Sequence, residues 1–347
     1  MTTLTNNFGI NLVLAVWLAH DDYDYQSAPN YVSATGIMKP LRHMILPKRV
    51  PAENRTTDVQ DLIASSLGSS IHDSVEKAWQ PGNFERNLKK LGYPSKVIDQ
   101  VLINPTDADL DAAKNPIPVY LEQRMYRPIT VNGITFIIGG KYDGITEGIV
   151  NDTKSTSAYS WMFGGKDADY QFQMSIYRWI DQKGHGDIHV DEDGNVHLLN
   201  PFRPRITEGY GRINFVFTDW QKMQAKTNPG YPQSRVEQKE INLLEPAEVE
   251  AILREKLRLF IKFRDAQETD IPHCTPEELW QSDPVYKYFS NPAKTDGRAT
   301  KNFDDLGEAM KFKAEKGKGT IITVPGSPKR CEYCDAFEVC TQKDQYQ

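Results

Sequence analysis

The stretch GGKYDGITEGIVNDTK, residues 139–154, decides the fold of this 347-residue chain. Residues 134–145 are rich in β-forming side chains, Glu147-Gly148 suits a two-residue turn, and residues 149–156 return as the antiparallel partner. Asp143 then lies directly opposite Asp152, with Cβ atoms roughly 5 Å apart. Side-chain alternation puts Lys154 on the face of Asp152 and turns the side chain of Thr153 away, leaving only its backbone near the site.

A preceding hairpin adds a third acidic side chain to this face. Asn132-Gly133 is the strongest short turn signal in the chain, and a two-residue loop there places Glu122 opposite Asp143. Glu122, Asp143 and Asp152 then form a row across three strands, which is unfavourable unless a cation lies among them. We therefore expect a bound divalent metal ion.

Two helices are predicted around this hairpin. Residues 168–182 have an apolar stripe on one face, with Gln173 and Tyr177 one turn apart on another. Residues 58–79 also favour a helix, in which Ser70 caps a turn, Ile71, Val75 and Ala78 or Trp79 face the core, and His72 lies on a flank.

These residues resemble the signature of the RecB-like nucleases of the PD-(D/E)XK superfamily. That signature has a His in an early helix, an Asp at the end of a strand, (Asp/Glu)-x-Lys on the next strand and Gln-x-x-x-Tyr on a helix. The matching positions here are His72, Asp143, Asp152-Thr153-Lys154 and Gln173 with Tyr177.

The resemblance implies an α/β fold, a restriction-endonuclease-like core in which helices flank a central mixed β-sheet. We expect residues 1–30 to be an N-terminal segment without an assigned role, residues 31–266 to be the nuclease core with insertions, and residues 267–347 to be a cysteine-cluster region that packs on the core.

The resemblance also implies roles for the matching residues. One or two Mg²⁺ or Mn²⁺ ions would be held by His72, Asp143, Asp152 and the carbonyl of Thr153. Glu122 is added as a ligand by the strand register and not by the resemblance. Asp143, Asp152 and Lys154 would carry the catalysis, with Lys154 positioning or deprotonating the attacking water. Gln173 and Tyr177 would steady the site and touch the DNA backbone.

All four cysteines lie in the last quarter of the chain, which favours a metal site over a disulfide framework. Cys331, Cys334 and Cys340 form a C-x2-C-x5-C run, and Cys274 is the fourth thiol. Four thiolates suffice for a [4Fe-4S] cluster or a structural Zn²⁺ ion.

The run resembles the cysteine triplet of RecB-like nucleases that carry an iron-sulfur cluster, including AddB-type and CRISPR-adaptation members. In those members the first cysteine lies upstream of the His motif. Residues 33–49 here contain none, so Cys274 would have to substitute, and zinc stays an alternative.

The net charge of −6 argues against binding nucleic acid by bulk charge, so contacts must come from local basic patches. Residues 39–49 and 291–330 are two such stretches, each readable as a solvated surface or as a phosphate-binding patch. The apolar run at residues 10–19 is too short to span a bilayer and no Lys or Arg precedes it, so we expect a cytoplasmic protein with no membrane partner.

The leading hypothesis is a metal-dependent DNA nuclease, an exonuclease on DNA ends or single strands that works in recombination, repair or replication. DNA and other recombination or replication proteins are the expected partners, and such accessory nucleases also occur in bacteriophages. The alternatives are a non-catalytic DNA-binding or assembly subunit that keeps the nuclease fold, and an iron-sulfur redox protein. The sequence leaves cleavage polarity, strand preference and oligomeric state open.

Overall fold

The computed structural model describes residues 3–164 and 166–346, and the chain divides into two compact units. The first unit comprises Met1–Lys39 and Thr56–Leu259, and the second comprises Pro40–Arg55 and Phe260–Gln347. Each unit therefore combines an early segment with a later one.

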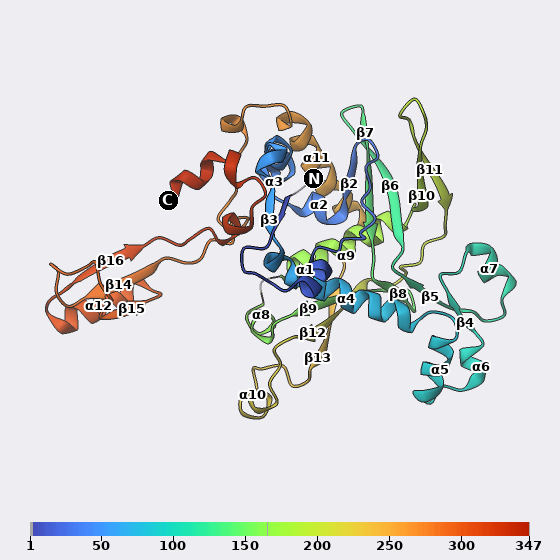
Figure 1. Ribbon diagram of the computed structural model, residues 1–347, viewed down its shortest axis with the longest axis horizontal. Coiled ribbons are helices and arrows are strands. Elements are labelled where there is room, and N and C mark those ends of the chain that lie inside the picture. Colours follow the sequence, from blue (N-terminus) through green and yellow to red (C-terminus); the bar gives the residue numbers. More distant parts are fainter. Residues whose placement is uncertain (1–2, 165, 347) are drawn as a thin grey trace. The chain divides into compact units, whose positions relative to one another are not determined.

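The first unit contains two mixed sheets (Figure 1). The larger has six strands in the order β13-β12-β9-β8-β5-β4, with β9 parallel to β12 and antiparallel to β8. Its strands are β4 (Val101–Ile103), β5 (Ile117–Leu121), β8 (Gly144–Thr146), β9 (Ile149–Thr156), β12 (Tyr210–Phe217) and β13 (Val236–Asn242).

The second sheet has the order β11-β10-β6-β7-β2. Its strands are β2 (Tyr31–Ser33), β6 (Arg124–Val131), β7 (Ile134–Lys141), β10 (His185–Val190) and β11 (Val196–Pro201). Strands β1 (Thr3–Thr5) and β3 (Thr56–Asp58) form a separate two-stranded parallel sheet.

Both predicted two-residue turns are confirmed. Thr146 pairs with Ile149 and Val131 pairs with Ile134, so each loop contains two residues. All four loop residues have positive φ, the conformation that two-residue hairpin turns of this type require. These residues are Asn132, Gly133, Glu147 and Gly148.

The single strand expected over residues 134–145 is wrong, because the chain breaks there into β7 and β8, which belong to different sheets. The register nevertheless continues across the break, since Arg124 pairs with Lys141 and Leu121 with Gly144. Tyr142 lies at the break, is fully buried and donates to Gln123 Oε1 at 3.1 Å. The buried Tyr142 thus lies where β7 has ended, and β8 begins two residues later.

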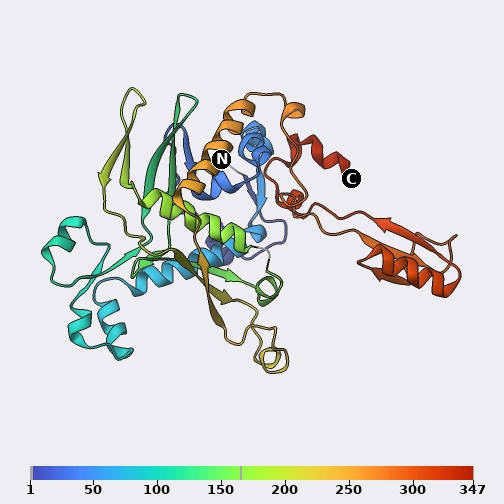
Figure 2. The same cartoon turned by 180° about the vertical axis from the view of Figure 1, so that it is seen from behind.

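Helices of the first unit cover the sheets. Helix α9 contacts strands of both sheets, and the reverse view shows it running across them (Figure 2). Helix α4 contacts β9. The helices are α1 (Leu12–Leu18), α2 (Ala34–Met38), α4 (Ile63–Ala78), α5 (Asn83–Lys90), α6 (Ser95–Ile98), α7 (Asp107–Ala112), α8 (Ala158–Phe163), α9 (Asp167–Asp181), α10 (Lys222–Thr227) and α11 (Pro246–Phe263), whose last turn belongs to the second unit.

The expectation for the helix that carries His72 is wrong in two respects. Ser70 caps nothing, because it lies inside α4 and donates to the carbonyl of Ser66 at 2.8 Å. No residue of α4, which the structure describes in full, is completely buried, and Val75 is 44% exposed. Helix α4 is a surface helix, so its flank rather than its apolar face serves the site.

The second unit contains a sheet of three strands in the order β15-β14-β16. Residues 291–330, expected to be loose, instead supply α12, whose Phe312 packs on Tyr288 and Phe303 with ring centroids 5.1 and 5.2 Å apart. The elements are α3 (Leu41–Ile45), β14 (Val285–Phe289), β15 (Lys301–Phe303), α12 (Leu306–Lys316) and β16 (Thr320–Val324), followed by short 3-10 turns at Lys329–Tyr333, Phe337–Val339 and Thr341–Gln345. No helix among the described residues is long and apolar enough to cross a membrane.

We predict that Gly140→Ala destabilises the protein by about 1–3 kcal/mol, the usual cost of overpacking a core. An alanine Cβ at this position in β7 would lie 2.5 Å from Cε1 of the buried Tyr177. Thermal unfolding measures the effect. Gly209→Ala is the matched control, because its Cβ would meet nothing within 4 Å and its φ is not positive; equal melting temperatures for the two variants would contradict the prediction.

Candidate active site

The two central acidic residues are placed by the hairpin of β8 and β9. Gly144 pairs with Asn151, so extending the register by one residue puts Asp143 opposite Asp152, as predicted. Asp143 Oδ2 also accepts a hydrogen bond of 2.6 Å from the backbone N–H of Thr153. The backbone of β9 thus fixes the orientation of the Asp143 carboxylate.

Asp152 is buried, with 2% of its surface exposed, and Lys154 lies on the same face of β9. Lys154 Nζ is 3.0 Å from Asp152 Oδ1 and 2.9 Å from Oδ2. Asp152 Oδ2 makes no hydrogen bond within the described part of the chain, although the ammonium group is near. A buried carboxylate oxygen in this state retains lone pairs for a cation.

A second group of ligand atoms gathers beside Asp143. His72 Nδ1, on α4, is 3.1 Å from Glu122 Oε1 and 3.7 Å from Asp143 Oδ1. One donor atom from each of the three side chains lies within 4.8 Å of the other two, so the group could hold a metal ion. Two carboxylates and an imidazole suit a divalent cation.

Electrostatics of the buried pair favour a positive partner. Burial, followed by the charge of Asp152, raises the pKa of Asp143 to about 7. Burial also raises the pKa of Asp152, which Lys154 only partly offsets. Burial alone would lower the pKa of Lys154, but the charge of Asp152, its hydrogen bond and the charge of Asp143 together outweigh burial, so the lysine remains an ammonium. One ammonium group leaves excess negative charge at the site.

His72 and Glu122 stabilise each other's charged forms. The hydrogen bond to Glu122 raises the pKa of His72 above its ordinary value, although burial opposes the shift. For Glu122, burial works toward a higher pKa, but His72 and Lys141 together lower it. Lys141 Nζ is 2.9 Å from Glu122 Oε2. The Lys141 ammonium and the charged form of His72 thus supply positive charge beside these carboxylates.

Gln173 and Tyr177 lie on α9 and form a chain of hydrogen bonds. Gln173 Nε2 donates to the hydroxyl of Tyr177 at 2.9 Å, and that hydroxyl donates to the carbonyl of Lys141 at 3.0 Å. Tyr177 is only 4% exposed, whereas Gln173 is half-buried. These two hydrogen bonds therefore hold the end of β7, two residues before Asp143, in place.

Sequence reasoning missed two residues beside the site. Lys141 precedes Asp143 by two positions, so strand alternation could have placed it on the same face. Tyr170 precedes Gln173 by three positions on α9, and the Lys154 ammonium lies 5.8 Å from the centre of its ring. Helical spacing could have indicated this aromatic neighbour.

The four cysteines all belong to the second unit. Burial is the main reason that the pKa rises to about 12 for Cys274 and about 11 for Cys334, and the charge of Cys340 adds to both shifts. Cys340 likewise raises the pKa of Cys331 after burial. Buried Gln342 joins Cys274 to the tail, accepting from its N–H and donating to its carbonyl, each at 2.8 Å. Distant thiols are thus brought into one neighbourhood.

The basic stretch at residues 39–49 does not present all its charges to solvent. Arg42 is 2% exposed, forms an ion pair with Glu268 and donates to the carbonyl of Ile271 at 2.8 Å. Its guanidinium is therefore a structural cation inside the second unit, and reading it as a phosphate contact is wrong.

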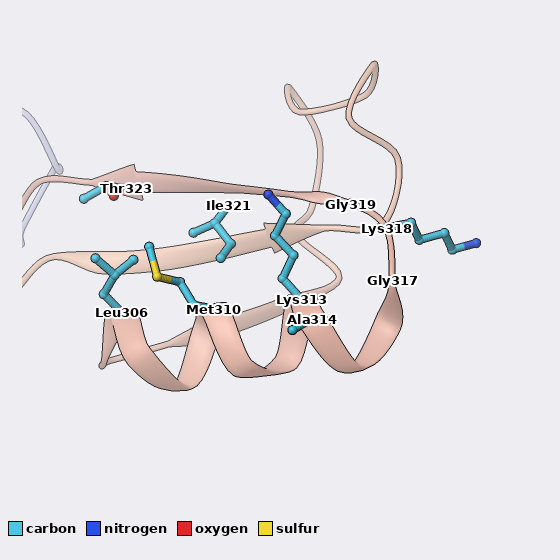
Figure 3. A pocket seen from close by; sticks show the side chains of 9 residues that line it. All are labelled: Leu306, Met310, Lys313, Ala314, Gly317, Lys318, Gly319, Ile321 and Thr323. Atoms are coloured by element: carbon cyan, nitrogen blue, oxygen red, sulfur yellow. The ribbon is translucent and has the colours of Figure 1, made fainter.

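A groove between α12 and β16 lies within the basic stretch at residues 291–330 (Figure 3). Leu306, Met310 and Ile321 point into the space between the helix and the strand, whereas Lys318 points away. None of the residues that line this groove belongs to the acidic site or to the cysteine group. The groove is lined by apolar side chains, with Lys313 and Lys318 at one end.

Divalent cations should stabilise the protein more at about pH 8 than at about pH 5. Because the folded pKa of Asp143 is raised to about 7, the folded state binds more protons than the unfolded state between about pH 4 and 7. The free energy of unfolding of metal-free protein therefore falls as pH rises through this window, and a cation offsets the loss by about 2.7 kcal/mol at 100 times its Kd.

Thermal unfolding with and without Mn²⁺ at both pH values measures this effect. Asp143→Asn is the control, because an amide keeps the shape of the side chain but cannot ionise. An equal Mn²⁺ shift of the melting temperature at both pH values in the unaltered protein would contradict the prediction.

Comparison with known proteins places this geometry in a family. The family model of the PD-(D/E)XK nuclease superfamily matches residues 40–341. A solved structure described as "Crystal structure of SSO0001" is similar, with 15% identity, a TM-score of 0.40, and coverage of 71% of this chain and 84% of that chain. No curated protein sequence matches the chain. On the match across most of its length, the chain belongs to the PD-(D/E)XK nuclease superfamily, whose members are metal-dependent nucleases.

Proposed function

We propose that this protein is a Mg²⁺- or Mn²⁺-dependent DNA exonuclease that hydrolyses phosphodiester bonds at DNA ends or in single strands, and that it works in recombination, repair or replication. The observation that carries the proposal is the convergence of Asp143, Asp152 and Lys154 from adjacent strands, beside His72 and Glu122. Other proteins of these processes are proposed partners, and the cytoplasm of the cell or of a phage host is the proposed location.

The residues fit a divalent cation. His72, Glu122 and Asp143 offer ligand atoms within 4.8 Å of one another, and the buried Oδ2 of Asp152 has no hydrogen bond among the described residues. We assign these four side chains, with the carbonyl of Thr153, as the metal ligands. A bound Mg²⁺ or Mn²⁺ ion would supply an activated water and neutralise the phosphate charge.

Lys154 has the position of a water-orienting group. Its ammonium is held at 2.9–3.0 Å by Asp152 and lies near the ring of Tyr170, so it has few other conformations. With its pKa raised it stays charged at neutral pH, which suits holding an attacking water and the phosphate rather than accepting a proton. We therefore assign Lys154 the positioning role.

Gln173 and Tyr177 support this arrangement from α9. The buried Tyr177 hydroxyl is committed to the Lys141 carbonyl, so it positions the strand end that leads to Asp143. The half-buried Gln173 amide is the member of the pair that we propose contacts the DNA backbone.

We propose that the thiols of the second unit hold a [4Fe-4S] cluster, with structural Zn²⁺ as the alternative. Half-buried thiols whose charges act on one another, in surroundings that disfavour a free thiolate, fit a group that stabilises deprotonated sulfur. When bound, such a group would tie the tail to the rest of the unit. The proposed thiol ligands are Cys274, Cys331, Cys334 and Cys340.

A pair of exposed aromatic rings supports action on unpaired DNA. Helix α8 begins directly after β9, and Tyr159 and Phe163 on it are each 67% exposed, with ring centroids 4.4 Å apart. Trp161 anchors the helix edge-on against Phe217 at 6.0 Å. Aromatic platforms of this kind stack on bases of single strands. The pair begins five residues after Lys154 along the chain.

Asp152→Ala and Lys154→Ala are each expected to lower the cleavage rate by about 100-fold or more, because each removes a charge placed against the reacting phosphate. Cleavage of linear DNA in Mn²⁺ measures the effect, and exposed Lys183→Ala is the matched control. Unchanged cleavage in the first two variants would favour the alternative function, a non-catalytic DNA-binding or assembly subunit.

Replacing Tyr159 and Phe163 together by alanine should slow cleavage of single-stranded DNA about tenfold, since each stacked base contributes roughly 1–3 kcal/mol. Hydrolysis of a small phosphodiester without bases should be unchanged, because the metal ligands remain. Tyr93→Ala removes a ring that is 50% exposed elsewhere and is the matched control. A double variant that cleaves single strands at the original rate would exclude the stacking role.

A further inference from the structure

We infer that His43 is a ligand of the metal centre in the second unit and takes the fourth position beside Cys331, Cys334 and Cys340, in place of Cys274. The inference rests on the proposed metal centre and changes its ligand set. It links helix α3, near the start of the chain, to the cysteine run near its end.

The contact that carries the inference is direct. His43 Nε2 lies 2.6 Å from Cys334 Sγ. Two donors of a tetrahedral ion, with about 2.3 Å to sulfur and about 2.0–2.1 Å to nitrogen, lie roughly 3.5 Å apart and aim at a common point. The imidazole nitrogen and the thiol sulfur are thus hydrogen-bonded, and a shift of about 1 Å would give them the separation of neighbouring ligands.

Helix α3 has a packing reason to present His43 at this place. Ile45 and Leu46 are buried in one cluster with Ile271 and Ala336, and Cys334 and Cys340 pack against that cluster. Arg42, the preceding residue, is fixed by Glu268 and by the Ile271 carbonyl. Side chains on both sides of His43 are thus anchored, so its ring is held against the cysteine run.

Backbone hydrogen bonds fix turns within the cysteine run. Cys334 N–H donates to the Cys331 carbonyl at 3.3 Å, and Phe337 N–H donates to the Cys334 carbonyl at 2.9 Å. These turns link Cys331 to Cys334, and Cys340 follows six residues later. The three thiols of the run leave one position of a tetrahedral ion for a donor from outside it. Of the two candidates, His43 is the one whose donor atom contacts a thiol of the run.

The ligand change has a consequence for stability. With Cys274 as the fourth ligand, all ligands would come from residues 274–340. With His43, the centre also secures residues 40–49, so removing the metal should loosen this early segment as well as the tail. Three thiolates and one imidazole form a known zinc set, and imidazole also replaces thiolate on some iron-sulfur clusters.

X-ray absorption of the full-length, anaerobically purified protein tests the inference without any substitution. The expected result is one nitrogen neighbour at about 2.0–2.1 Å beside sulfur at about 2.3 Å, if zinc is bound. For an iron-sulfur cluster, nitrogen coupling in pulsed electron paramagnetic resonance of the reduced protein is the corresponding signal. An all-sulfur shell, or no metal in the thiol site, overturns the inference.

Variants give a second readout. His43→Ala should weaken metal retention against a chelator at least tenfold and raise hydrogen exchange at residues 40–49, whereas His43→Cys should restore retention. Cys274→Ser should keep the metal, and His273→Ala, an exposed histidine next to Cys274, is the matched control. Loss of metal in Cys274→Ser with retention in His43→Ala overturns the inference. DNA cleavage, which depends on the acidic site, separately tests the proposed nuclease function.

Discussion

Mutual repulsion of two carboxylates is the constraint on which the nuclease site depends. Asp143 and Asp152 face each other across adjacent strands in surroundings that raise both pKa values. Lys154 compensates one charge directly, and His72 approaches the other. Nearby positive charge stabilises two facing carboxylates, and a divalent cation supplies more of it than one ammonium group does.

Other contacts of the first unit hold the two carboxylates in their facing positions. The backbone N–H of Thr153 fixes one carboxylate, and Tyr177 fixes the strand end that precedes it. Tyr177 can reach the Lys141 carbonyl because Gly140 leaves room for its ring. The second unit follows a related principle with softer donors. Its thiols are half-buried, in surroundings where free thiolates are unfavourable and a metal group would be stabilising.

Local patterns predicted much of the site because they depend on short-range geometry. The dipeptides Asn132-Gly133 and Glu147-Gly148 specified two-residue turns, and each turn fixed a register. Those registers place Glu122, Asp143 and Asp152 in one row through local pairing alone. Period-two alternation put Lys154 on the correct face. The PD-(D/E)XK fold followed from the same motifs, and the family match bears it out.

Tertiary packing decided what no local pattern contains. The strand break at Tyr142 depends on a ring filling the core between two sheets, so residues 134–145 alone read as one strand. The burial of Arg42 depends on Glu268, more than 200 residues away, which turned an apparent surface charge into a structural ion pair. The sequence by itself determined the turns, the registers and the residue types of the acidic site, because neighbours in the chain control these. Only the folded chain decided which distant groups meet, as His43 does with Cys334, because long-range contacts are set by the packing of whole elements.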